Sequence, residues 1–295
     1  MKQGRRVFLV PLLALALLIM TLAGPLNASA ASAPLMGAKT KNANLVQPHI
    51  VSNLLYHGGP VMGGTTLVFA IFWEPTGSFV SPAYNKLILR YFGDVGPSPL
   101  YHNNIQYKDA GGNVPTNSVL AGVFVDTAPY PSNPISDAQV QAEVSHAQAV
   151  NGWVSSIHNI FFVFTARGEN ICISPGVCSF TTFCAYHNFF GANTIYGAMP
   201  YTGTNLAACG TPVSPNADFD ADSTINVTSH EQMEAATDPL LSAWFDSSGQ
   251  EIGDKCNFNF GPILPSGGDV VFAGHPYIVQ KEWDNARRAC VLAGP

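Results

Sequence analysis

The sequence predicts an α/β (α+β) fold in which a mixed sheet packs against helices. Three observations predict it. Apolar runs typical of buried strands alternate with segments of helical periodicity as far as about residue 239. The remaining chain is rich in Gly, Pro and Asn and holds only short strand candidates. All six cysteines lie in the second half, which predicts a loop-rich, disulfide-stapled C-terminal half.

Residues 1–30 have the features of a secretory signal peptide. Lys2, Arg5 and Arg6 form a positive region, an apolar stretch follows at 7–22, and Ala28-Ser29-Ala30 is a small-residue cleavage site. The alternative is a membrane anchor, but no charged stop follows the apolar stretch. No other segment is long and apolar enough to span a bilayer. We therefore expect a secreted, extracellular protein.

After the leader we expect a linker or short pro-segment at 31–50 and a single secreted domain at 51–295. Three of the 13 basic residues lie in the leader, so its removal changes the formal net charge from −6 to −9. Such an acidic chain argues against binding to nucleic acid or to anionic membranes. The expected partner is a protein or peptide substrate or a cell-wall component, and the sequence indicates no oligomeric state.

In the first half of the domain, the apolar run at 65–73 (TTLVFAIFW) predicts a buried strand. A helix should follow, with Ser81 as N-cap, Pro82 at its first position and Gly93 at its end. A second strand is predicted at 118–126. Further helix and strand candidates are a helix whose capping box is Ser136 with Gln139, and strands at 159–166 and 194–201.

The stretch VTSHEQMEAATDP, residues 227–239, predicts a helix that begins around 222–225 and ends before Pro239. Short strands are predicted beyond it at 269–274 and 276–283. The order of strands, helices and motif helix suits a zincin-like architecture by analogy.

The even number of cysteines in an exported chain predicts three disulfide bonds. A cysteine zinc site is the alternative, which the absence of any C-x-x-C pair disfavours. The preferred pairings are Cys172–Cys178, Cys184–Cys209 and Cys256–Cys290.

The motif helix carries H-E-x-x-E, which differs from the zinc-protease motif H-E-x-x-H by a glutamate in place of the second histidine. His230 and Glu234 are four residues apart and share one helix face, so both can ligate one metal ion. Glu231 is offset by about 100°. At that offset the glutamate of H-E-x-x-H enzymes acts as general base on the bound water.

A third metal ligand is expected from the acidic residues that follow the helix. Glu251 and Asp254 are candidates, one as ligand and the other as a group that orients His230. Zinc is the expected cofactor, because imidazole and carboxylate are both zinc ligands. The extra carboxylate makes the site friendlier to harder cations, so calcium is the alternative. A solvated polar helix face without any metal is the competing interpretation.

Other groups are weaker candidates for a site. Asp238 and Asp246 are possible additional ligands, and His57 in the glycine-rich YHGGP turn is more typical of a surface or capping histidine. Cys184 and His187 are interpreted as half of a disulfide bond and a loop histidine, not as a nucleophile pair.

Four stretches together resemble the EXORDIUM/phosphate-induced protein 1 family. They are YHGGPVMGG, SHEQMEAATDPLLSAWFD, EIGDKC and YIVQKEWDNA, and the resemblance covers about residues 54–290. It departs from plant members at Asp238, where they tend to have Asn, and in a shorter spacing before Glu251. The resemblance implies an extracellular or cell-wall-associated protein, and it implies no established reaction.

Two functions follow from these observations. The first is a secreted zinc-dependent hydrolase, a peptidase, with His230, Glu234 and one of Glu251 or Asp254 as ligands and Glu231 as general base. The alternative is a non-catalytic extracellular signalling or cell-wall-associated protein with a structural metal or polar site. A disulfide-stapled carbohydrate-binding domain is a third, weaker hypothesis, which rests on aromatic content and secretion.

Overall fold

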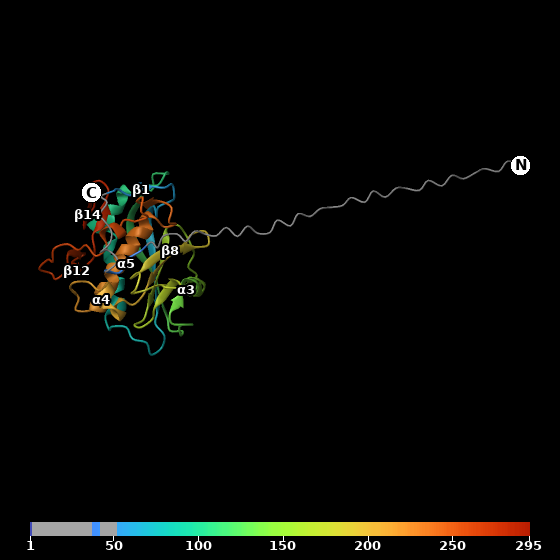
Figure 1. Cartoon of the computed structure of the whole chain (residues 1–295), viewed down its shortest axis with the longest axis horizontal. Coiled ribbons are helices and arrows are strands. Elements are labelled where there is room, and N and C mark those ends of the chain that lie inside the picture. Colours follow the sequence, from blue (N-terminus) through green and yellow to red (C-terminus); the bar gives the residue numbers. More distant parts are fainter. Residues whose placement is uncertain (2–36, 42–51) are drawn as a thin grey trace. The chain divides into compact units, whose positions relative to one another are not determined.

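A five-stranded sheet forms the centre of the fold in a computed structural model, which describes Met1 and residues 37–41 and 52–295 (Figure 1). The first four strands in its spatial order are parallel, and the last is an antiparallel edge strand. The order is β3 (Pro115–Asp126), β2 (Gly64–Trp73), β5 (Asn159–Thr165), β9 (Thr194–Met199) and β8 (Tyr186–Phe190).

Helices cover both faces of this sheet. Because successive strand residues point to opposite faces, the alternating residues of β2 and β5 divide between two hydrophobic clusters. One cluster joins the sheet to α1 (Tyr84–Val95) and α5 (Phe219–Thr237), and the other joins it to α3 (Asp137–Asn151). In Figure 1, α5 (orange) and α3 (green) accordingly lie on opposite sides of the sheet.

Short elements fill the connections and the C-terminal half. Within the described residues the short helices are α2 (Pro99–His102) and α4 (Leu206–Cys209), and the 3₁₀ turns are η2 (Asn103–Gln106), η3 (Thr202–Thr204) and η4 (Asp254–Cys256). The small sheets are β1 (Leu55–Tyr56) with β10 (Trp244–Phe245), β4 (Ile135–Ser136) with β6 (Ile171–Ser174) and β7 (Val177–Cys178), β11 (Val270–Phe272) with β12 (His275–Tyr277), and β13 (Glu282–Asp284) with β14 (Ala289–Val291).

The predicted mixed α/β fold is confirmed, with differences at element ends. The helix predicted to end at Gly93 continues to Val95, since Gly93 faces open space and needs no turn. Its expected N-cap, Ser81, instead donates its hydroxyl to Asp218 at 2.8 Å. The motif helix α5 begins earlier than predicted, at Phe219, because the Asp218 side chain accepts the N–H of Ala221.

The strand predicted at 276–283 is divided into β12 and β13. Between them, the Gln280 N–H donates to the side chain of Asn226 at 2.8 Å instead of to a neighbouring strand. This hydrogen bond connects the segment between β12 and β13 directly to α5.

The three predicted disulfide pairings are all present: Cys172–Cys178, Cys184–Cys209 and Cys256–Cys290. The last of these joins η4 to β14. All three bonds lie in the C-terminal half, as predicted.

The predicted leader at 1–30 and most of the predicted linker at 31–50 fall outside the described residues. Residues 37–41 are described and belong to the same compact unit as residues 52–295. Among the described helices, none combines the length and apolar character needed to cross a bilayer.

Candidate metal centre

Helix α5 is buried along almost its whole length although its sequence is polar. Every residue from Asp220 to Thr237 is buried. Some of its polar side chains bond distant segments of the fold: Gln232 donates to the hydroxyl of Ser118 at 2.8 Å, and Asn226 accepts the N–H of Gln280. The interpretation as a solvated polar face is therefore wrong. Asn226 also begins an N-x-T glycosylation sequence, and its side chain is buried like the rest of the helix.

His230, Glu234 and Asp254 converge from α5 and η4. Nε2 of His230 lies 2.9 Å from Oε1 of Glu234, and the Asp254 N–H donates to the same oxygen at 3.0 Å. One donor atom from each of the three residues lies within 4.8 Å of the others. The spacing of four residues on one helix thus brings His230 and Glu234 to one point, and the return of the chain at η4 adds an acidic residue.

A second group of donors shares Glu234. Nδ1 of His187 lies 3.3 Å from Oε2 of Glu231 and 3.6 Å from Oε2 of Glu234, and these three residues also meet within 4.8 Å. All three side chains are completely buried. Glu234 is therefore the residue common to both possible ligand sets.

The interpretation of His187 as a loop histidine was wrong, because it lies in the edge strand β8 and points into the cluster. The signal that could have identified it is the short alternation in YHNFF, residues 186–190. The apolar pattern of that run is weak, so the sequence does not predict a strand that packs against α5.

Several donor atoms in this cluster have no hydrogen-bond partner among the described residues. They are Nδ1 of His230, Oε2 of Glu234, both carboxylate oxygens of Glu251 and Oδ1 of Asp254. Nε2 of His230 is close only in distance to Oε1 of Glu234, at 2.9 Å, without hydrogen-bond geometry. Buried polar atoms in folded proteins are nearly always bonded, so such a group indicates an ion or water in the site. His, Glu and Asp are zinc-competent ligands, so the donor set fits a metal ion.

The charge of the cluster favours a cation as well. The carboxyl groups of Glu231, Glu234, Glu251 and Glu282 are fully buried, and Asp254 is nearly so. The basic groups around them are two histidines and Lys39, whose Nζ lies 3.7 Å from Oδ1 of Asp254. Buried anions are costly unless they are paired, and a divalent cation would offset this excess.

The protonation equilibria reflect the same imbalance. Burial alone would lower the pKa of His230, but the neighbouring carboxylates, Glu234 first, raise it to about 10. Burial raises the pKa of Asp254 to about 7, helped by the charge on Glu234. Burial and Glu234 likewise raise the pKa of Glu251. Without a metal ion, bound protons would neutralise part of the buried negative charge. Metal binding would displace these protons.

The structure places the other predicted site residues as follows. Glu251 adjoins the cluster: its N–H donates to Oδ2 of Asp254 at 3.4 Å, and its Oε1 lies 3.7 Å from Nε2 of His187. Asp246 instead binds Lys255 at 3.0 Å, and Asp238 accepts the N–H groups of Ser242 and Ala243.

His57 also lies apart from the candidate centre. Its ring is exposed and stacks on Phe245, with a centroid distance of 3.6 Å. The neighbouring glycines serve backbone geometry, since a Cβ on Gly59 would collide with Ser242.

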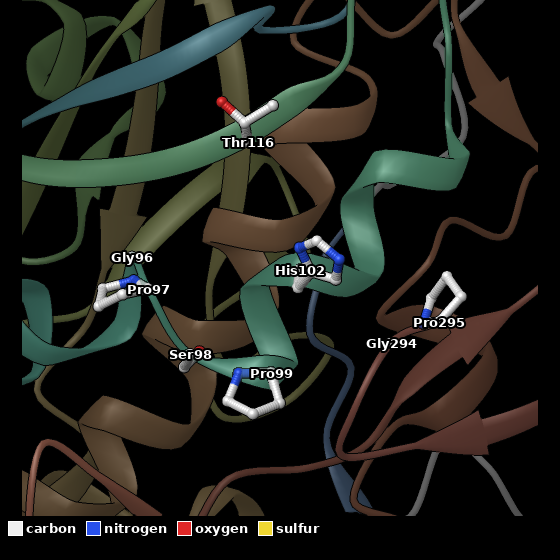
Figure 2. Close-up of a pocket in the computed structure, with 8 residues that line it drawn as sticks. All are labelled: Gly96, Pro97, Ser98, Pro99, His102, Thr116, Gly294 and Pro295. Atoms are coloured by element: carbon white, nitrogen blue, oxygen red, sulfur yellow. The ribbon is translucent and has the colours of Figure 1, made fainter.

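Two hollows in the described surface are lined by other residues. One, of about 360 Å³, lies where the segment that follows α1 meets the C-terminus, and its lining includes Ser98, His102 and Thr116 (Figure 2). Another, of about 450 Å³, is lined by Trp73, Asp126, Glu143 and His146 among others. Neither includes a residue of the candidate metal centre.

Comparison with known proteins gives one informative relative. The chain is 22% identical over 292 residues to Protein EXORDIUM-like 5 of Arabidopsis thaliana, a match that covers 82% of this chain and 78% of the relative. The chain is a distant homologue of this EXORDIUM-like protein. No protein-family model and no solved structure matches the chain. The resemblance expected from the sequence is thereby confirmed as distant homology, and the zincin-like analogy stays a prediction.

Proposed function

We propose that this chain is an extracellular, EXORDIUM-related protein whose buried zinc centre has a structural role. His230, Glu234 and Asp254 would hold the ion. The observation that carries the proposal is the set of unpartnered donor atoms that α5 and η4 direct to one buried point. An ion bound there would link the central helix to the disulfide-held loop, since η4 ends at Cys256 and Cys256 is bonded to Cys290.

The hydrogen bonds favour this ligand set over the one that contains His187. Nδ1 of His230 and Oδ1 of Asp254 lack hydrogen-bond partners among the described residues, and Nε2 of His230 contacts Glu234, itself a member of this ligand set, at 2.9 Å. By contrast, Nδ1 of His187 contacts Glu231, and its Nε2 lies 3.4 Å from the carbonyl oxygen of Asp238. A histidine whose ring nitrogens already contact other protein groups would orient the metal ligands rather than bind the ion.

The donor types favour zinc over calcium. Calcium takes six to eight oxygen ligands, whereas zinc accepts imidazole nitrogen together with carboxylate oxygen in a compact site of about four ligands. Here one imidazole and two carboxylates meet, with Glu251 close by as a further donor.

A structural role accounts for the burial of the centre and for the engagement of Glu231. Glu231 is fully buried, its Oε1 accepts the N–H of Ala38 at 2.8 Å, and its Oε2 contacts His187. A general base must instead reach a water molecule or a substrate. In the conformation described, both oxygens of Glu231 are occupied by the protein itself.

A zinc-dependent peptidase is the second candidate, favoured by the position of Glu231 directly after a ligand histidine on α5. A bound zinc ion would supply Lewis acidity. Glu231 would take the proton of the attacking water once its contact with Ala38 is released. Glu231→Gln should then retain the metal and lose cleavage of a general protein substrate; unchanged cleavage would remove Glu231 from the reaction.

The structural proposal is tested by metal-dependent melting. Zinc added to chelator-treated protein should raise the free energy of unfolding by about 4 kcal/mol when free zinc is about a thousand times its dissociation constant. Glu234→Gln should abolish this response, whereas Glu169→Gln, at a buried glutamate outside the centre, should retain it. An equal response in wild type and Glu234→Gln would contradict the proposal.

We further propose that the protein acts outside the cell, with a cell-wall component or a peptide as partner and without nucleic acid. The disulfide bonds and the homology to an EXORDIUM-like protein support this location. Mass spectrometry of protein recovered from the medium would test it, with loss of the predicted leader as the expected result.

A further inference from the structure

Residues 37–41 lie directly against the candidate metal centre. The Ala38 N–H donates to Oε1 of Glu231 at 2.8 Å, and Nζ of Lys39 lies 3.7 Å from Oδ1 of Asp254. Ala38 is only 1% exposed. A short segment from the chain's N-terminal region therefore covers two of the acidic groups of the centre, more than 190 residues away in sequence.

This segment is held mainly through its backbone, as an added strand. Lys39 forms an antiparallel bridge with Phe183. On either side of that bridge, the Cys184 N–H donates to the Ala38 carbonyl at 2.6 Å, and the Thr40 N–H donates to Thr182 at 3.4 Å. Strand addition of this kind is a common way for proteins to bind extended peptides, since backbone hydrogen bonds supply affinity for many sequences.

Close contacts along the same edge restrict what can lie there. Gly37 has φ +143°, and a Cβ on it would come within 2.8 Å of the Ala185 carbonyl oxygen and of Tyr186 Cα. Nδ2 of Asn257 donates to the Lys39 carbonyl at 3.1 Å, and Nζ of Lys41 donates to the Leu206 carbonyl at 3.2 Å. The edge therefore accepts glycine at position 37, a small residue at position 38, and lysine at positions 39 and 41.

We propose that the edge at 182–184, together with Glu231 and Asp254, is a binding groove for an extended peptide with a Gly-Ala-Lys type of sequence. Residues 37–41 are its intramolecular occupant. Another peptide binds only after this segment leaves, and its backbone N–H then takes the place of the Ala38 N–H on Glu231. The inference deepens the proposed function because it identifies the ligand class of the same site, but the groove itself does not require a bound metal.

The test uses the whole secreted chain with Gly37→Val, which should displace the segment by steric collision. Gly77→Val is the matched control, because Gly77 also has positive φ but faces open space. The probe is the synthetic heptapeptide MGAKTKN, residues 36–42. It should bind Gly37→Val at least tenfold more tightly than wild type or Gly77→Val, measured by calorimetry. Equal affinity for all three proteins, or no binding to any, would overturn the proposal.

A second peptide tests the contact with Glu231. The same heptapeptide with Pro in place of Ala38 lacks the N–H that would bond Glu231, so it should bind Gly37→Val at least tenfold more weakly. Equal binding of both peptides would also overturn the proposal. Zinc content is measured on every sample. A protein that binds the peptide but holds no zinc would refute the metal centre alone and leave the groove intact.

If Gly37→Val does not fold, hydrogen exchange of the unmodified protein shows whether residues 37–41 can leave the edge. The proposal requires the segment to leave without global unfolding. The Cys184 amide, which bonds Ala38, should therefore exchange at least tenfold faster than amides in β5. Exchange of Cys184 only at the rate of global unfolding would show that residues 37–41 are a fixed part of the fold.

Discussion

Gly253 lies so close to the imidazole of His230 that a Cβ on it would come within 2.8 Å of the ring carbon Cγ. The glycine thus forms one wall of the pocket that holds the ring. Its carbonyl oxygen also accepts Nε2 of Gln280 at 2.9 Å, which fixes the loop. The residue before Asp254 therefore controls how closely η4 approaches the histidine on α5.

Gly253→Ala should weaken metal binding without unfolding the protein. The added methyl group must push the His230 ring or the loop away, and disturbance of groups that orient metal ligands typically costs about 10–100-fold in affinity. Titration with a chromophoric chelator would measure it. Gly93→Ala is the control, because Gly93 lies in a helix with open space at its Cβ. Equal zinc affinity in both variants would show that His230 does not bind the ion.

The two possible ligand sets can be separated by isosteric amides. Asp254→Asn should reduce zinc affinity by at least tenfold, because it replaces an anionic ligand by a neutral one of the same shape. Glu231→Gln should change the affinity much less, because Glu231 contacts Ala38 and His187. Competitive chelator titration of both variants checks this. The reverse order would assign the ion to the group with His187.

The disulfide bonds should contribute unequally to the centre. Cys256–Cys290 closes a 34-residue separation and holds η4, whereas Cys172–Cys178 closes a separation of six. In the chain-entropy account, replacement of the first pair by serine should cost about 4 kcal/mol and of the second about 2 kcal/mol. Denaturant unfolding measures this difference. Only the first double variant should also lose zinc; retention there would show that the loop is positioned without the bond.

Glu143 should give the stability a pH dependence that is independent of the metal. Burial, followed by the charge of Asp126, raises the pKa of Glu143 from 4.5 to about 8. The folded state then binds a proton that the unfolded state loses, so stability falls as pH rises between these values.

The variant Glu143→Gln removes this titration. It should be more stable than wild type at pH 8.5 by about 1–3 kcal/mol, the usual cost of burying a poorly compensated polar group. The advantage should disappear near pH 4.5. Urea unfolding at both values provides the measurement, and a difference that does not change with pH would contradict the assignment.

The parts of the fold with strong local patterns were predictable from sequence. The apolar runs of β2 and β5 and the capping box of α3 specify their elements locally, since the Ser136 N–H does bond Gln139 at 2.7 Å. Among the disulfide bonds, Cys172–Cys178 was the most predictable, because a separation of six residues favours a local loop. The other two pairings, with separations of 25 and 34 residues, were preferences among several.

The candidate centre was only partly predictable. The helical spacing of His230 and Glu234 is a local property, so their convergence follows from sequence. His187 and Ala38 reach the same point through β8 and an isolated bridge, both of which depend on long-range pairing. The burial of α5 from Asp220 onward was also not predictable, because some of its polar residues find partners on distant segments such as Ser118 and Gln280.

Metal analysis of the purified protein tests the central claim most directly. After dialysis with zinc and removal of excess metal, inductively coupled plasma mass spectrometry should find about one equivalent of zinc per chain. The Glu234→Gln variant, which alters the carboxylate shared by both donor groups, should hold less than a tenth of that amount. Less than a tenth of an equivalent in the wild-type protein would contradict the account.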